Sequence, residues 1–99
     1  MDDVFDYVKD HTVCTEEEYK YTARDGKCKD DKCTLNLGVK GRINVESGSV
    51  DALLEAAEHS PLVVAIDASP MSFYRGGVLE IKSSSLNHGV VMVGYNLDA

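Results

Sequence analysis

The first hydrophobic pattern in the chain spans residues 2–10, "DDVFDYVKD". Val4, Phe5 and Val8 fall on one face of a helix, because residues three and four positions apart lie about one turn apart. Aspartates at the start and a lysine near the end suit the positive and negative ends of a helix dipole. The pattern therefore predicts a short amphipathic helix.

Helical spacing returns over residues 50–58. The apolar stripe there consists of Val50, Leu53, Leu54 and Ala57. Ser49 stands immediately before this stripe, and a serine hydroxyl at that place can accept a hydrogen bond from a free backbone N–H of the first turn. We expect a second helix over 50–58, capped by Ser49.

Strand patterns occupy most of the second half. Apolar and polar residues alternate in "VKGRINVE", residues 39–46, which predicts a half-buried strand. The apolar runs "LVVAIDA" at 62–68 and "VLEI" at 78–81 predict two further strands, joined by a turn-rich connector at 69–77. A fourth, "HGVVMVGY" at 88–95, is apolar enough to be buried on both faces. Together with the helices, these elements indicate an α+β fold with mostly antiparallel strands.

Residues 11–37 show no sustained periodicity, although they hold all three cysteines. Loops longer than about 12–15 residues are uncommon in compact domains, so this excursion needs a clamp. One interpretation is a zinc site built from His11, Cys14, Cys28 and Cys33, whose spacing is close to that of zinc ligands. Such a site would make the chain a zinc-clamped interaction domain.

Composition narrows the function further. The 99 residues suffice for one modest domain, and 43% hydrophobic with 27% charged residues is typical of a globular chain. A net charge of −7 with scattered cations argues against nucleic acid as a partner. No apolar run reaches the roughly 18–20 residues that span a bilayer, and the acidic start predicts no secretory signal peptide within the chain.

Four stretches, taken in order, resemble the papain family of cysteine proteases. The first is "MDDVFDYV" followed by "CTEEEYKYTARDGKC", and the second is "LLEAAEHSPLVVAIDAS". The third is "FYRGGVLE", and the fourth is "LNHGVVMVGYN", which is similar to the family segment that carries the catalytic histidine. Order, spacing and coverage of nearly the whole chain make the match specific.

The resemblance implies a single partial papain-like domain over 1–99. Residues 1–12 would supply a helix of the family's left-hand, helical half. Residues 13–38 would form an irregular segment with the cysteines. Residues 39–99 would belong to the sheet-rich, barrel-like right-hand half.

The same resemblance makes His88 the catalytic histidine of a thiol protease. An adjacent imidazolium can lower the pKa of a cysteine thiol from about 8.5 to about 4, which yields the thiolate that attacks the peptide bond. The ring then protonates the leaving amine. Without the flanking motifs, a lone histidine beside an apolar run is more often a structural residue.

Further positions match the family's substrate pocket. They are Met1, Ala65, Leu86 and Gly89, which would line the subsite for an apolar side chain two places before the cut, and Asn87, whose backbone would face the departing part of the substrate. The small Ala65 and Gly89 would leave space for leucine or phenylalanine. Ordinary core packing is the alternative interpretation of Ala65 and Leu86.

The cysteines fit the family unevenly. Cys28 matches the cysteine of "D-G-x-C", which in the family bonds to a partner upstream of residue 1. Cys14 and Cys33 depart from the commonest pattern and could bridge each other. An odd count leaves at least one thiol unpaired within the chain.

Three catalytic parts of the family have no counterpart in these residues: the "C-G-S-C-W" nucleophile, the upstream glutamine and the "N-S-W-G" asparagine. We therefore expect the isolated chain to be inactive, with a missing N-terminal half, a second chain or self-association covering its apolar surface. No cofactor or metal is implied, peptides or proteins would be the substrates, and the compartment would be lysosomal, vacuolar or extracellular. A non-catalytic module that binds peptides or a partner is the alternative.

Overall fold

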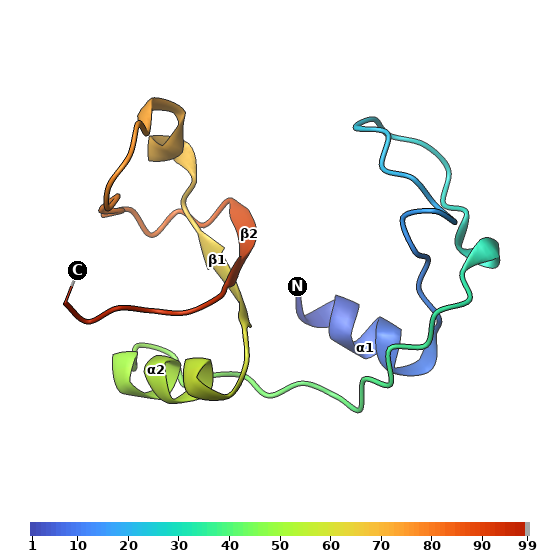
Figure 1. Cartoon of the computed structure of the whole chain (residues 1–99), viewed down its shortest axis with the longest axis horizontal. Helices are drawn as coiled ribbons and strands as arrows, with labels where there is room; N and C mark the ends of the chain where they lie inside the picture. Colours follow the sequence, from blue (N-terminus) through green and yellow to red (C-terminus); the bar gives the residue numbers. More distant parts are fainter. Residues whose placement is uncertain (99) are drawn as a thin grey trace. The chain divides into compact units, whose positions relative to one another are not determined.

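The computed structural model describes residues 1–98, which form two compact units. The N-terminal unit is Met1–Ile43 and the C-terminal unit is Asn44–Ala99. Figure 1 shows their helices and strands, which are α1 (Asp2–Asp10), η1 (Asp30–Lys32), α2 (Val50–His59), β1 (Leu62–Ile66), η2 (Ser69–Phe73) and β2 (His88–Met92). Both predicted α-helices are confirmed within one residue of their expected ends.

Helix α1 keeps one apolar residue away from solvent, Val8, which is 7% exposed. Two aspartates of the helix also hold the end of the unit. The guanidinium of Arg42 lies 3.5 Å from a carboxylate oxygen of Asp2 and 3.5 Å from one of Asp6. These ion pairs are half exposed and individually weak, so they orient the returning chain more than they stabilise it.

The irregular segment after α1 is clamped at its base. Val13 and Leu35 exchange two backbone hydrogen bonds, with N···O distances of 2.8 and 3.0 Å. Beside this bridge, Cys14 and Cys33 form a disulfide across a sequence separation of 19. The bridge that the sequence allows between these two cysteines is therefore present.

A second link joins the two arms of the same segment beside the disulfide. Glu18 accepts a hydrogen bond from the Thr34 hydroxyl and another from the Thr15 backbone N–H, at 3.0 Å in the latter case. The hydrogen bond from Thr34 is the main reason that the pKa of Glu18 lies below its usual value. The outgoing and returning arms are thus held together by a carboxylate as well as by the disulfide.

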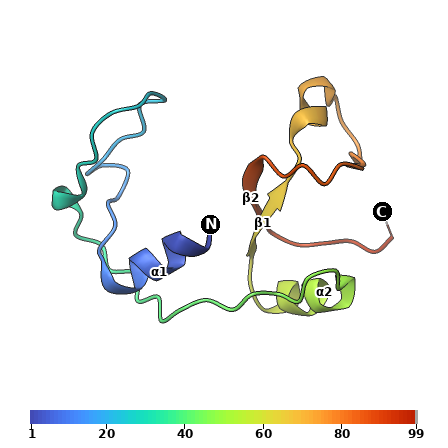
Figure 2. The same cartoon turned by 180° about the vertical axis from the view of Figure 1, so that it is seen from behind.

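Helix α2 begins as expected at the Ser49 cap, whose Oγ accepts a hydrogen bond from Ala52 N at 3.1 Å. The preceding Gly48 has φ 75°, a left-handed conformation that glycine adopts without steric cost. Helix α2 leads into β1, which pairs antiparallel with β2 from Leu62↔Met92 to Ile66↔His88. The Tyr95 hydroxyl donates to Glu58 and ties the chain after β2 back to α2. Figure 2 shows the strand pair and helix from behind.

Two predicted strands are wrong. Residues 39–46 and 78–81 are irregular, and Ile43 is 96% exposed. The strand predicted over 88–95 ends at Met92, and Val93 beyond it is 86% exposed. The prediction that this strand is buried on both faces is therefore wrong as well. The physical reason is the same in each case: a strand forms where a partner strand supplies the hydrogen bonds, and the sheet in the described residues has two strands.

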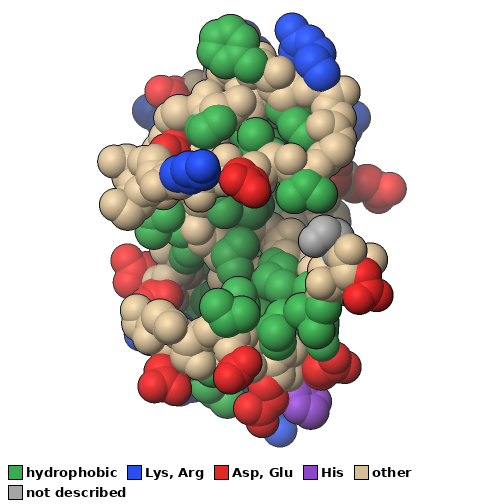
Figure 3. Space-filling model, turned by 90° about the vertical axis from the view of Figure 1, so that its left-hand side faces the viewer, with side chains coloured by type: hydrophobic (Ala, Val, Ile, Leu, Met, Phe, Trp, Pro, Cys, Tyr) green, Lys and Arg blue, Asp and Glu red, His purple; other side chains and the backbone are tan. Residues whose placement is uncertain are grey.

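Hydrophobic side chains remain widely exposed. Among residues 1–98, only Val8 and Asp67 are buried, and the accessible area of the chain is 8590 Å². Two separate folded units, each of half the 10.8 kDa mass of the chain, would expose only about 6,700 Å². Figure 3 shows hydrophobic side chains gathered on the surface. Each unit is therefore held by local clamps more than by a core of its own.

Within residues 1–98, no helix is long and apolar enough to cross a membrane.

The clamp leads to a first prediction. Replacing both Cys14 and Cys33 with serine should reduce the free energy of local opening at the Val13–Leu35 bridge by about 3 kcal/mol, the closure entropy of a loop of this length. Amide hydrogen exchange at Val13 and Leu35 measures it. Cys28→Ser is the control, since that cysteine is free. Equal protection in the double variant and the control would refute the clamp.

Candidate functional site

His88, the predicted catalytic histidine, is the first residue of β2 and is exposed. It lies directly opposite Ile66, the last residue of β1. The residue before it, Asn87, donates its backbone N–H to the Ile66 carbonyl oxygen at 3.0 Å. His88 therefore stands at the end of a paired ladder, on backbone fixed from the neighbouring strand.

Four of the five predicted pocket residues lie around this end of the ladder. Ala65 is paired with Gly89, while Leu86 and Asn87 immediately precede β2. Directly opposed residues share one face of a sheet and neighbours along a strand alternate between faces, so Ala65 and Gly89 lie on the face opposite His88. Met1 belongs to the N-terminal unit, and its place beside the others stays a prediction.

A buried carboxylate adjoins the same end. Asp67 follows β1 directly and is 5% exposed. Its Oδ1 accepts hydrogen bonds from the backbone N–H of Ser69 at 2.9 Å and from Nδ2 of Asn87 at 3.1 Å. Hydrogen bonds from Ser69, joined by those from Ser83 and Asn87, lower the pKa of Asp67 to about 2 against the opposing effect of burial. The carboxylate is therefore ionised in any ordinary buffer.

The Asn87 side chain is fully engaged in this network. Its Oδ1 accepts from the Ala68 backbone N–H at 2.9 Å, and its Nδ2 also donates to the Ser69 hydroxyl at 3.1 Å. The turn after β1 is thereby fastened to the residue that precedes His88. Sequence reasoning assigned Asn87 a backbone role and missed Asp67. An aspartate two residues before a serine at the end of an apolar run is the pattern of an Asx turn, and it could have pointed to Asp67.

The zinc interpretation is wrong. Two of its four ligands, Cys14 and Cys33, are bonded to each other, so neither can offer a thiolate. Across residues 1–98 no three His, Cys, Asp or Glu side chains are grouped in a way that could hold a metal ion. Cys28 is a free, exposed thiol, and its bond to a cysteine outside the chain remains a prediction.

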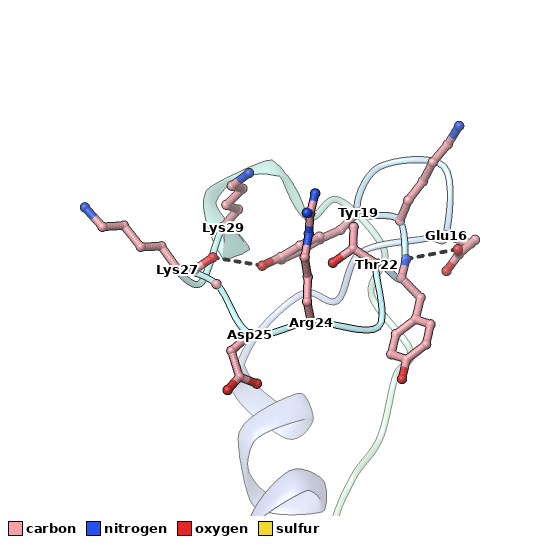
Figure 4. Close-up of a pocket in the computed structure, with 10 residues that line it drawn as sticks. Glu16, Tyr19, Thr22, Arg24, Asp25, Lys27 and Lys29 are labelled. Carbon is pink, nitrogen blue, oxygen red and sulfur yellow. Dashed lines mark hydrogen bonds between the residues drawn. The ribbon is translucent and has the colours of Figure 1, made fainter.

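A hollow in the N-terminal unit has a volume of about 540 Å³. Its lining comes from Glu16, Tyr19, Lys20, Tyr21, Thr22, Arg24, Asp25, Gly26, Lys27 and Lys29. Two hydrogen bonds brace it, from the Tyr19 hydroxyl to the Lys27 carbonyl at 3.0 Å and from Tyr21 N to Glu16 at 3.1 Å. In Figure 4 the ammonium end of Lys27 extends away from Arg24. None of the predicted site residues lines this hollow.

Comparison with known proteins gives the same assignment as the motifs. The family model described as papain family cysteine protease matches residues 1–99. A Paramecium tetraurelia protein named Cathepsin L 2 is 41% identical over 98 residues, covering 99% of this chain and 31% of that protein. A Caenorhabditis elegans protein named Cathepsin L-like is 41% identical over 105 residues, with 99% and 31% coverage. Vignain from Phaseolus vulgaris is 40% identical over 100 residues, with 96% and 28% coverage.

This chain belongs to the papain family of cysteine proteases. It spans about a third of the length of the curated relatives it matches, 31% in the case of the Paramecium protein. The α+β class expected for a papain-family fragment agrees with two α-helices and an antiparallel strand pair.

The Asp67 network of this papain-family chain leads to a second prediction. A carboxyl whose pKa is lowered on folding adds stability above its unfolded pKa of about 3.9, and this stability is lost as the pH falls through its folded value. The difference in melting temperature between wild type and Asp67→Asn should therefore be full above about pH 4 and shrink toward pH 2. Thermal unfolding across this range measures it. A difference that stays constant down to pH 2 would contradict the network.

Proposed function

We propose that this chain supplies the catalytic histidine, His88, of a papain-family cysteine endopeptidase. The observation that carries the proposal is the "LNHGVVMVGYN" segment, which begins β2 with an exposed histidine on backbone pinned to β1. Membership in the family supports it. The nucleophilic cysteine would come from outside these 99 residues.

The chemistry follows from the imidazole. As a base, His88 takes the proton of the thiol, and the resulting imidazolium stabilises the thiolate. The thiolate adds to the peptide carbonyl carbon, and the imidazolium gives its proton to the departing amine. Water then hydrolyses the thioester with His88 again as base. A histidine at the rigid end of a strand pair suits both proton transfers, because each depends on reach and direction.

The isolated chain should have no activity of its own. Cys14 and Cys33 are bonded to each other in a disulfide, so Cys28 is the one free thiol. Cys28 lies in the irregular part of the N-terminal unit and lacks the aromatic residue and helix that follow the family's nucleophile. In the whole protein, or together with a second chain, the remaining parts of the family fold would also cover the exposed apolar residues and complete the barrel-like right-hand domain.

Peptide substrates would bind beside the end of the β1–β2 pair at which Ile66 faces His88. Ala65 and Gly89 face each other across the strands and carry almost no side chain, so they would leave room for a leucine or phenylalanine two places before the cut. Leu86 would add an apolar wall to this pocket. The Asn87 backbone would face the departing part of the substrate.

A lysosomal, vacuolar or extracellular location fits the same proposal. Disulfides persist in oxidising compartments and are rare in the cytosol. The Cys14–Cys33 disulfide supports such a location, as do relatives named as cathepsins.

The catalytic assignment can be tested in a chimera. These 99 residues would replace the matching segment of the Paramecium relative, which would supply the family's nucleophile and the remaining parts of the site. His88→Ala should lower kcat/KM of the chimera for a fluorogenic dipeptide substrate by at least about 10³-fold, as expected when a member of a catalytic unit is removed. His59→Ala, at the exposed end of α2, is the matched control. Near-normal turnover by the His88 variant would refute the assignment.

The pocket can be tested in the same chimera. Ala65→Phe should fill the pocket and lower kcat/KM by about 10-fold or more for substrates with leucine or phenylalanine two places before the cut. The kcat/KM for substrates with alanine at that place should fall less. Val93→Phe introduces the same phenylalanine side chain at an exposed position outside the strand pair and serves as the control. An unchanged preference in the Ala65 variant would remove this residue from the pocket.

A further inference from the structure

Asp67 has no part in the chemistry proposed for His88, yet it is one of two buried residues in the described chain. A buried carboxylate is costly unless hydrogen bonds compensate the loss of water. Here the donors come from both sides of the ladder end: Ser69 from the turn after β1, and Asn87 from the residue before β2. A carboxylate in this place joins the two segments that frame His88.

The partners of Asn87 fix which way its carboxamide faces. The Asp67 carboxylate can only accept, so it must meet the Nδ2 side at 3.1 Å. The Ala68 backbone N–H can only donate, so it must meet Oδ1 at 2.9 Å. Each contact enforces the same orientation, and removing Asp67 would leave Asn87 with a weaker preference.

This orientation bears on the catalytic segment through the backbone. Asn87 is held at its own N–H by the Ile66 carbonyl and at its side chain by Asp67 and Ala68. His88 is the next residue, so its Cα position and the direction of its side chain follow from the way in which Asn87 is held. Displacements near 1 Å at a reacting group can cost about 10²-fold in rate.

We propose that Asp67 is a positioning residue: its ionised carboxylate orients the Asn87 carboxamide and thereby fixes the backbone from which His88 reaches the nucleophile. The inference rests on the catalytic role proposed for His88. Asp67 itself touches neither substrate nor the reacting atoms in this account.

The structural half of the proposal is tested on the chain itself by NMR. In Asp67→Ala the amide of Ala68 and the side-chain amide of Asn87 should lose at least about 10-fold of their hydrogen-exchange protection, since each relies on a hydrogen bond in the network. The His88 backbone amide should shift as well. Asp51→Ala, an exposed acid of the same unit, should leave all three unchanged. Unchanged signals in the Asp67 variant would overturn the proposal, whatever the activity measurements give.

The catalytic half is tested by paired substitutions in the chimera. Asn87→Ala removes the carboxamide on which Asp67 acts and should lower kcat by about 10²-fold, with less effect on KM. Adding Asp67→Ala to that variant should cause little further loss of kcat, although Asp67→Ala alone lowers it. A residue with a merely structural role would instead make the double variant worse than either single one.

The outcomes separate the two proposals. If His88→Ala leaves the chimera active, the catalytic role of His88 fails, and the positioning role fails with it. If His88→Ala abolishes turnover and the double variant is clearly worse than Asn87→Ala, the positioning role alone fails. A kcat of the double variant equal to that of Asn87→Ala, together with the loss of amide protection in Asp67→Ala, supports the positioning role.

Discussion

Pairing of β1 with β2 in a single register decides which side chains meet at the end of the ladder. Ile66 opposite His88 and Ala65 opposite Gly89 put the histidine on one face and the two small residues on the other. A slip of one residue would exchange these faces. The hydrogen bonds of Asn87 with Ile66, Ala68 and Asp67 lie just beyond the last pair and oppose such a slip. Site geometry and strand register therefore depend on the same few contacts.

The strand pair has no substantial hydrophobic core packed against it in the described residues. In the described residues only Val8 and Asp67 are buried, and apolar side chains such as Ile43 are exposed. Order comes instead from local devices: a disulfide and a two-residue bridge in the N-terminal unit, and a capped helix with a strand pair in the C-terminal unit. The proposed function assumes that further parts of the family fold would cover these exposed apolar side chains.

Sequence reasoning succeeded where a signal is local. The spacing of apolar residues and the Ser49 cap identified both helices, because helix formation depends on neighbours within one or two turns. It failed for residues 39–46 and 78–81. An alternating or apolar pattern indicates that a segment could be covered in a sheet, but it does not show that a partner strand is present. Asp67 was missed for a related reason: its importance lies in a contact with Asn87, 20 residues away.

The central claim is that this chain provides the histidine and not the sulfur. It is tested most directly by labelling with a thiol-directed peptidyl epoxide, read out by intact mass and peptide mapping. The account predicts no active-site adduct on the purified 99-residue chain, and one adduct on the chimera, at a cysteine outside these residues, that is lost in His88→Ala. An adduct at Cys28 of the isolated chain, accompanied by inhibitable peptide hydrolysis, would contradict it.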